Sequence, residues 1–310
     1  MIKTVAYQVL LIFIYIVLGF ILKKSDKISD KGTKDITNIL LTLVTPCVLI
    51  SSYQEKISAF SPQLIKGLLI AALLSFLVQI ITISIPYLFF HDEKRKVSIF
   101  ASAYSNCGFM AIPLLSSVLG SDGVFYGAIY LALFTLLYWT HGVYLYTGDK
   151  KSISAKSLLL NPGVIGAVLA LLLFFLKIEL PNFLSDTVKG VAALNSPLSM
   201  LILGTYLAKV DMKKALSRLS LYKVVFIRLL LSPMITILLL TVAKIVFKAD
   251  NTVLLSVLIP ASAPAAAVSA LFAHRFGEDA TYASELVAIS TLLSIGTMPL
   301  MIYISEFFIK

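Results

Sequence analysis

The sequence predicts an all-α polytopic membrane protein with ten transmembrane helices, arranged as two inverted five-helix repeats in which helices 4 and 9 are broken. Three observations predict this fold. First, 59% of the 310 residues are hydrophobic and only 14% are charged, whereas a soluble domain holds about 25% charged residues. Second, the apolar residues form ten runs, and a membrane helix needs ~20 residues. Third, two of these runs carry prolines at matching places in the two halves of the chain.

The ten apolar runs fill the chain and leave only short connections, with no room for a soluble catalytic domain. They lie near residues 4–22, 36–53, 62–90, 96–119, 123–147, 157–177, 187–208, 221–247, 251–273 and 281–308. The first run is too long for the apolar part of a cleaved signal peptide, and no small-residue cleavage site follows it. Several later runs exceed 20 residues, which permits tilt or a break.

Basic residues gather in the connections after the first, third, fifth, seventh and ninth runs. These connections hold most of the 26 Lys and Arg side chains: Lys23, Lys24, Lys27, Lys31, Lys34, Lys94, Arg95, Lys96, Lys150, Lys151, Lys156, Lys209, Lys213, Lys214, Arg218, Lys223 and Arg275. Basic loops favour the cytoplasm, so both termini are expected to be non-cytoplasmic. We interpret the net charge of +10 through this topology and through contact with anionic lipids of the cell membrane, and we expect no nucleic-acid partner.

The second half of the chain repeats features of the first at a shift of about half the length. Gly120-Ser121-Asp122-Gly123 aligns with Gly277-Glu278-Asp279-Ala280, and Thr45-Pro46 in the second run corresponds to Ser196-Pro197 in the seventh. Because five helices is an odd number, a second copy enters the membrane from the opposite side, which gives an inverted repeat typical of secondary transporters. The two repeats are expected to comprise residues 1–155 and 156–310.

The fourth and ninth runs contain residues that break a membrane helix. The fourth holds Ser105-Asn106-Cys107-Gly108 and then Ile112-Pro113, and the ninth holds Pro260-Ala261-Ser262-Ala263-Pro264. Proline removes a backbone donor and clashes with the preceding turn, so breaks in hydrocarbon survive only inside protein or beside water. The N–H end of a broken helix can hold an anion, and the carbonyl end can hold Na⁺ or accept a proton donor. A simple kink is the alternative, but two matched breaks favour a midplane binding site, and Asn106 adds an amide there.

Two ionisable residues lie inside apolar runs. Glu285 is near the start of the tenth run, where it is either interfacial or serves a coupled proton or cation. Arg228 is about one turn into the eighth run, and we expect its side chain to snorkel to the cytoplasmic surface. Since no Lys or Arg is then near either break, neutral dipoles are expected to hold the substrate.

The cysteine and histidine pattern predicts neither disulfides nor a metal centre. Cys47 and Cys107 both lie in apolar runs, which argues against a disulfide framework. His91, His141 and His274 lie at the ends of three separate runs without metal-ligand spacing. We expect no metal, no cofactor and no catalytic residue.

These motifs resemble the auxin efflux carrier family of membrane transporters, which includes bacterial members and the plant PIN proteins. The segment Asn106–Pro113 is similar to the family's Asn…Gly-Ile-Pro crossover. Further similarities lie in the second half, at Pro264-Ala265, Ala273, Phe276-Gly277, Ser290–Ser294 and Pro299-Leu300. Two features depart from the family: Ala111 stands where Gly is frequent, and Pro260 and Pro264 are spread where many members have adjacent prolines. The long central hydrophilic loop of the large plant members has no counterpart.

The resemblance implies that the two broken helices cross and bind substrate beside the crossover. It further implies a mobile transport domain of helices 3–5 and 8–10 that moves against a scaffold of helices 1, 2, 6 and 7. Family substrates are small organic anions, such as auxin in plants and malate or malonate in some bacteria. Asn106 then contacts substrate, and Pro113 and Pro264 break their helices.

The candidate site residues form four groups. The substrate-binding candidates are Ser105, Asn106, Cys107, Gly108, Ser262 and Ala263. The helix breakers at the crossover are Pro113, Pro260 and Pro264. The scaffold-side pocket candidates are Thr45, Pro46, Ser196 and Pro197, and the candidates for ion or proton coupling are Glu285 and Ser294.

The function expected from the sequence is a secondary transporter that moves a small carboxylate across the cell membrane by elevator-type alternating access. An enzyme is not expected, because the chain has no HExxH motif and no second carboxylate deep in a run beside Glu285. A channel or a membrane receptor for a small ligand is the alternative, ahead of an intramembrane enzyme. The expected partners are the anion, either Na⁺ or H⁺ if transport is coupled, membrane lipids, and a second copy of the chain, as in related carriers.

Overall fold

The computed structural model describes residues 2–154, 156 and 159–309. Among these residues every named element is helical, and one isolated antiparallel bridge pairs Ser105 with Ala265. Seven described stretches are long and apolar enough to cross a membrane: Tyr7–Lys24, Asp30–Gln54, Pro62–Leu88, Cys107–Thr147, Asn182–Leu207, Leu219–Phe247 and Ala280–Ile309. Shorter apolar helices cover Pro162–Phe175 and Asn251–Ala261. The expectation of an all-helical, multi-pass membrane protein is confirmed.

Short helical elements join into longer rods in the first half of the chain. Its elements are α1 (Ile2–Lys24), α2 (Asp30–Ile39), the π-helical η1 (Leu40–Val44), α3 (Thr45–Gln54), α4 (Pro62–Ser84), the 3₁₀ helix η2 (Ile85–Leu88), α5 (Arg95–Ala103), the π-helical η3 (Cys107–Ala111), α6 (Ile112–Leu137), the π-helical η4 (Tyr138–Gly142), α7 (Val143–Thr147) and the 3₁₀ helix η5 (Lys150–Ser152).

The second half follows a similar plan. Its elements are α9 (Pro162–Phe175), α10 (Asn182–Ala192), α11 (Asn195–Leu207), α12 (Met212–Ser217), α13 (Leu219–Phe226), the π-helical η6 (Ile227–Leu231), α14 (Ser232–Phe247), α15 (Asn251–Ala261), α16 (Val268–Arg275) and α17 (Ala280–Ile309). Helix starts follow the chain's own signals: Ser61 caps α4 and Asn161 caps α9, in each case with proline at the first helical position.

Each apolar run falls on one or more helices wherever the structure describes it, and two boundaries differ from expectation. Gly120, expected in a connection, lies within α6, where φ 64° and ψ −152° interrupt the helix without a loop. The seventh run consists of two helices, because the chain breaks at Ala193 and Leu194 between α10 and α11. The arrangement of ten spans as two inverted halves stays a prediction.

Prolines explain three of the four π-helical segments. A proline clashes with the carbonyl four residues earlier and cannot donate to it. Pro46, Pro113 and Pro233 each lie two residues beyond a π-helical segment, so the affected carbonyl is inside η1, η3 or η6 respectively. The wider π turn accommodates the proline while the rod continues.

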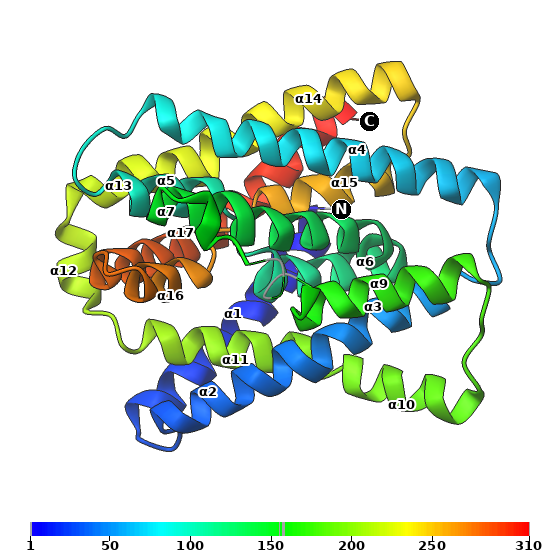
Figure 1. Ribbon diagram of the computed structural model, residues 1–310, viewed down its shortest axis with the longest axis horizontal. Coiled ribbons are helices and arrows are strands. Elements are labelled where there is room, and N and C mark those ends of the chain that lie inside the picture. Colours follow the sequence, from blue (N-terminus) through cyan, green and yellow to red (C-terminus); the bar gives the residue numbers. More distant parts are fainter. Residues whose placement is uncertain (1, 155, 157–158, 310) are drawn as a thin grey trace.

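The helices lie at the lower side, at the upper side and in the middle of the molecule in the view of Figure 1. Helices α2, α3, α10 and α11 lie along the lower side of the view, whereas α4, α13 and α14 lie along the upper side, with α5, α6, α15, α16 and α17 between them. Helix α9 packs against α3, and α1 packs against α11. Backbones approach closely there, since a Cβ on Gly19 or Gly204 would overlap the carbonyl of Leu201 or Ile16 on the other helix.

Candidate functional site

Two interrupted helices meet in the middle of the molecule. Helix α5 ends at Ala103 and α15 ends at Ala261, and in each case the chain runs without helical structure before the next helix begins. The backbone N–H of Asn106 donates to the carbonyl of Pro264 at 2.7 Å, and the N–H of Ala266 donates to the carbonyl of Tyr104 at 2.9 Å. The two breaks therefore pair as a short antiparallel ladder, with each break supplying hydrogen bonds that the other has lost.

The prolines contribute differently from expectation. Pro264 lies inside the second interruption, and Pro260 occupies the last turn of α15. Pro113 is the second residue of α6, after η3, so it widens the helix that follows the first interruption rather than creating that interruption. The first break centres on Ser105 and Asn106, where ψ of Asn106 is 55°.

All six predicted substrate-binding residues lie in or directly beside these breaks. Their side chains are buried apart from the partly exposed Gly108: Ser105, Asn106, Cys107, Ser262 and Ala263. New helices begin directly after the breaks, so the first N–H groups of η3 and α16 have no partners within their own helices. Such ends carry partial positive charge and bind anions.

Arg228 overturns one expectation from the sequence. It does not snorkel, because its side chain is 0% exposed within η6. Its Nη1 donates to the carbonyls of Ser102 at 3.2 Å and Ala103 at 3.0 Å, and its Nη2 donates to the carbonyl of Ala261. The expectation that no cationic residue lies near either break is therefore wrong. The fold brings run eight against both breaks, which its place in the sequence did not reveal.

Several buried polar atoms around the breaks have no hydrogen-bond partner among the described residues. In the two breaks and on Arg228 they are Ser105 Oγ, Asn106 Nδ2, Ser262 Oγ and Arg228 Nε. Ser102 Oγ, Ser232 Oγ, Ser269 Oγ and Thr291 Oγ1 belong to the helices around them. Buried polar groups in folded proteins are nearly always satisfied, so these atoms are the ones at the breaks that remain available to a polar ligand.

Neighbouring helices hold the breaks from two sides. The N–H of Ala265 donates to Ser290 Oγ of α17 at 3.1 Å. At the first break, the hydroxyl of Tyr104 donates to the carbonyl of Leu137 at 3.0 Å and lies 2.8 Å from Nδ1 of His141, whose Nε2 lies 2.9 Å from the Tyr87 hydroxyl. Ser290, Tyr104 and His141 were not predicted as supports of the site.

A cavity of about 340 Å³ brings two predicted groups together. Pro113 of α6 and Ser196 of α11 both line it, with Ser52 and Glu55 from the α3 region and Lys189 from α10. Thr45 instead returns its hydroxyl to the carbonyl of Leu40 at 2.9 Å. The charged residues Glu55 and Lys189 were not predicted here, because neither lies in the central part of an apolar run.

The other predicted scaffold residues and the coupling candidates lie apart from this cavity. Pro46 packs against Gly166 of α9. Pro197 is the third residue of α11 and is partly buried. Ser294 donates to the carbonyl of Thr291 at 2.6 Å and lies 3.8 Å from Met110 Sδ of η3, so it approaches the first break.

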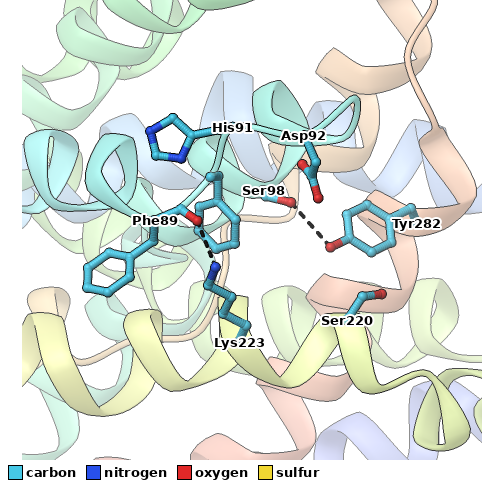
Figure 2. A pocket seen from close by; sticks show the side chains of 8 residues that line it. Phe89, His91, Asp92, Ser98, Ser220, Lys223 and Tyr282 are labelled. Atoms are coloured by element: carbon cyan, nitrogen blue, oxygen red, sulfur yellow. Dashed lines mark hydrogen bonds between the residues drawn. The ribbon is translucent and has the colours of Figure 1, made fainter.

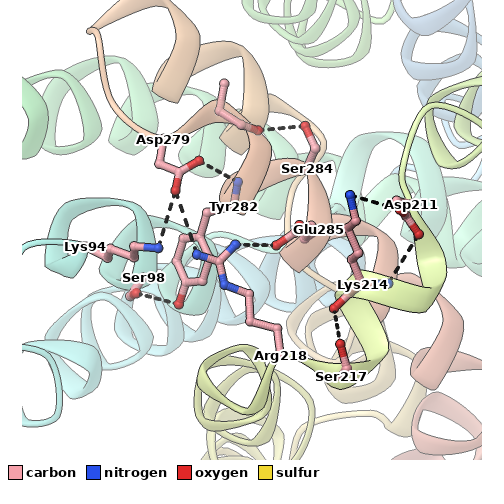
Figure 3. Close-up of polar contacts among 11 residues, drawn as sticks. Lys94, Ser98, Asp211, Lys214, Ser217, Arg218, Asp279, Tyr282, Ser284 and Glu285 are labelled. Atoms are coloured by element: carbon pink, nitrogen blue, oxygen red, sulfur yellow. Dashed lines mark hydrogen bonds and ion pairs between the residues drawn. The ribbon is translucent and has the colours of Figure 1, made fainter.

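Glu285 belongs to an ionic cluster that includes Lys94 and Arg218 of two basic connections (Figure 3). Its carboxylate accepts from Arg218 at 2.6 Å, and Asp279 lies 3.4 Å from Lys94 and 4.0 Å from Arg218. Lys94 and Arg218 also lie over the ring of Tyr282, each at 4.8 Å from its centroid. This position agrees with the interfacial interpretation of Glu285, and its coupling role stays a prediction.

A second cavity, of about 270 Å³, lies beside this ionic cluster (Figure 2). Lys223 donates to the carbonyl of Phe89 at 2.7 Å at one side, and Ser98 and Tyr282 lie 3.2 Å apart at the other. Ser98 belongs to the first turn of α5, whereas the break follows the last residue of that helix. The cavity is therefore separate from the paired breaks.

Comparison with known proteins shows the family of the chain. The family described as "Membrane transport protein" matches residues 4–302. The chain belongs to this family. It is the auxin efflux carrier family that the sequence resembles, so that resemblance is confirmed. An "Uncharacterized transporter" of Methanothermobacter thermautotrophicus is 24% identical over 301 residues, covering 94% of this chain and 95% of the relative. The protein is thus a membrane transporter.

Proposed function

We propose that this transporter is a secondary carrier for a small organic anion with a carboxylate group, working across the cell membrane by elevator-type alternating access. The supporting observation is the pairing of the two breaks through Asn106, Pro264, Tyr104 and Ala266. Two helix starts and an unpartnered amide converge there, and all of these groups donate to anions.

The proposal assigns the paired breaks to the transport domain, made of helices 3–5 and 8–10. Helices α1, α2, α3, α9, α10 and α11 form the scaffold, and both termini lie outside the cytoplasm. The cavity at Pro113 and Ser196 supports this division, because it lies between scaffold helices α3, α10 and α11 and the transport helix α6. A second copy of the chain is expected to pack on the scaffold, and the repeats 1–155 and 156–310 supply one break each.

Purified protein in liposomes tests the proposal with a panel of radiolabelled mono- and dicarboxylates that includes indole-3-acetate, malate and malonate. A carrier shows saturable uptake that is accelerated by unlabelled substrate on the opposite side. Flux without saturation or exchange would instead show a channel. Saturable uptake of none of the carboxylates would refute the proposed substrate class.

The variant Asn106→Ala tests whether Asn106 contributes to substrate binding at the paired breaks. We expect at least a tenfold loss of uptake, because the variant removes an amide that faces the break with a free Nδ2. Gln79→Ala is the matched control: Gln79 is also a buried amide, but its Nε2 already has a partner, because it donates to the carbonyl of Tyr130 at 3.1 Å. Equal uptake by Asn106→Ala and wild type would remove Asn106 from the substrate site.

A further inference from the structure

Arg228 is a buried cation held by main-chain atoms instead of an acidic side chain. Its three hydrogen bonds end on the carbonyls of Ser102 and Ala103, at the end of α5, and of Ala261, at the end of α15. Among the described residues it forms no ion pair, whereas Arg218 pairs with both Glu285 and Asp279. A charge in the membrane interior without such a pair is costly and marks a functional position.

Arg228 lies where the partial negative charges of two helix ends meet, so its positive charge can be compared with theirs. Each helix end carries about half an elementary charge, negative at the carbonyl end and positive at the N–H end. The carbonyl ends of α5 and α15 together carry about −1, and one guanidinium balances them. The N–H ends of η3 and α16 together carry a further charge of about +1, which no group named so far balances. One carboxylate would balance it.

Carriers with broken helices commonly use such carbonyl ends to coordinate the Na⁺ or H⁺ that drives transport. Here the guanidinium occupies this place for both half-helices at once. An arginine also does not release its proton at any physiological pH, so its charge is constant. Neither a sodium ion nor a titrating proton is then needed between these helix ends.

We propose that Arg228 is the resident cation of the paired breaks: it replaces a coupling cation at the carbonyl ends of α5 and α15, and it makes the site independent of sodium and selective for an anion of single charge. This inference extends the proposed carboxylate transport by naming the charge balance of that site. The assignment of the cation itself is tested without any transported substrate.

The experiment measures the melting temperature of detergent-purified protein in NaCl and in choline chloride of equal concentration, together with equilibrium binding of radioactive sodium. Wild type is expected to melt at the same temperature in both salts and to bind no sodium. Arg228→Met leaves the carbonyls without a cation. It is expected to melt at least 5 °C lower than wild type in choline chloride, to recover at least half of that loss in NaCl, and to bind sodium.

Arg228→Lys restores one charge and is expected to remain indifferent to sodium, as is the control Arg218→Met, which removes an arginine of the peripheral ionic cluster. Sodium binding by wild type would overturn the inference, as would a folded Arg228→Met protein that ignores sodium. If Arg228→Met cannot be purified, Arg228→Lys decides: sodium indifference supports a resident cation, and stabilisation by sodium overturns it. Carboxylate uptake by a wild type that binds sodium would leave the proposed function standing and refute only this inference.

Discussion

Gly19 and Gly204 allow the backbones of α1 and α11 to touch. Replacing glycine by alanine should therefore lower stability at this contact and raise it at an open helix position. Gly204→Ala places a methyl group on the Ile16 carbonyl, so it should lower stability by ~1–3 kcal/mol. Gly190→Ala, on α10 with open space around it, should raise stability by ~0.5–1 kcal/mol through helix propensity. Thermal melting of the detergent-purified variants measures both effects. A Gly204→Ala protein as stable as wild type would contradict the close packing.

Asp279 predicts a specific acid sensitivity. Burial alone raises its pKa, but the N–H of Tyr282, at 2.8 Å, and the charges of Lys94 and Arg218 outweigh burial, so the pKa lies below the ordinary 3.8. A lowered pKa stabilises the fold above pH ~4, and that stabilisation is lost as the pH falls through the lower value. Asp279→Asn should therefore melt below wild type at pH 6, and the gap should narrow toward pH 3. A constant gap would show that the charge of Asp279 is not involved.

Single residues show what a sequence can and cannot reveal about the site. The position of Asn106 and Ser262 at helix breaks could be predicted, because both accompany prolines in apolar runs. Their contact with substrate stays a prediction. The prediction that the Arg228 side chain snorkels is wrong, because Arg228 is far from both breaks in the sequence but contacts them in space. One signal in the sequence could have indicated a functional role for Arg228: it is a charged residue inside an apolar run, and that run contains no acidic residue to pair with it.

Two glycines have positive φ but differ in conformation. One lies near a region that only glycine adopts, and the other adopts a conformation that asparagine also tolerates. Gly120, at φ 64° and ψ −152°, lies near a region restricted to glycine, whereas Gly148, at φ 68° and ψ 0°, is left-handed. A methyl group added at either glycine would meet no neighbouring atom, so clashes with the surroundings play no part. Gly120→Asn should cost ~1–3 kcal/mol and Gly148→Asn much less. Equal melting temperatures of the two variants would contradict this distinction.

The helices themselves were largely predictable, because hydrophobic runs of membrane length have few alternatives to helix. The π-helical segments were not expected, although the prolines that explain them are visible in the sequence. The pattern becomes clear only when Pro46, Pro113 and Pro233 are compared, since each follows its π segment by the same two residues. The pairing of the two breaks depends on contacts between distant runs and needed the structure.

An ion pair between Lys56 and Asp122 connects the two proposed domains. Lys56 follows scaffold helix α3, and Asp122 lies within transport helix α6. In a Cys47→Ala background, Lys56→Cys with Asp122→Cys should lose at least 90% of uptake after treatment with a short reversible bifunctional thiol reagent and recover it after reduction. The reason is that an elevator cannot move while its two parts are tied together.

The control pair joins residues within the transport domain. Lys96 and Glu278 form an ion pair at 2.9 Å between the start of α5 and the connection before α17. Cross-linking Lys96→Cys to Glu278→Cys should leave uptake within twofold of the untreated variant, because both residues move together. Full uptake by the cross-linked Lys56→Cys/Asp122→Cys protein would rule out relative motion of the two domains.

The contact between α1 and α11 also affects how the cell makes this protein. The partner of the first helix is synthesised about 180 residues later, which at 5–20 residues per second is a delay on the order of ten seconds or more. Throughout that interval the glycine face of α1 meets only lipid or the insertion machinery. Newborn chains that stall before α11 therefore lack the main packing partner of their first helix and are natural targets for membrane quality control.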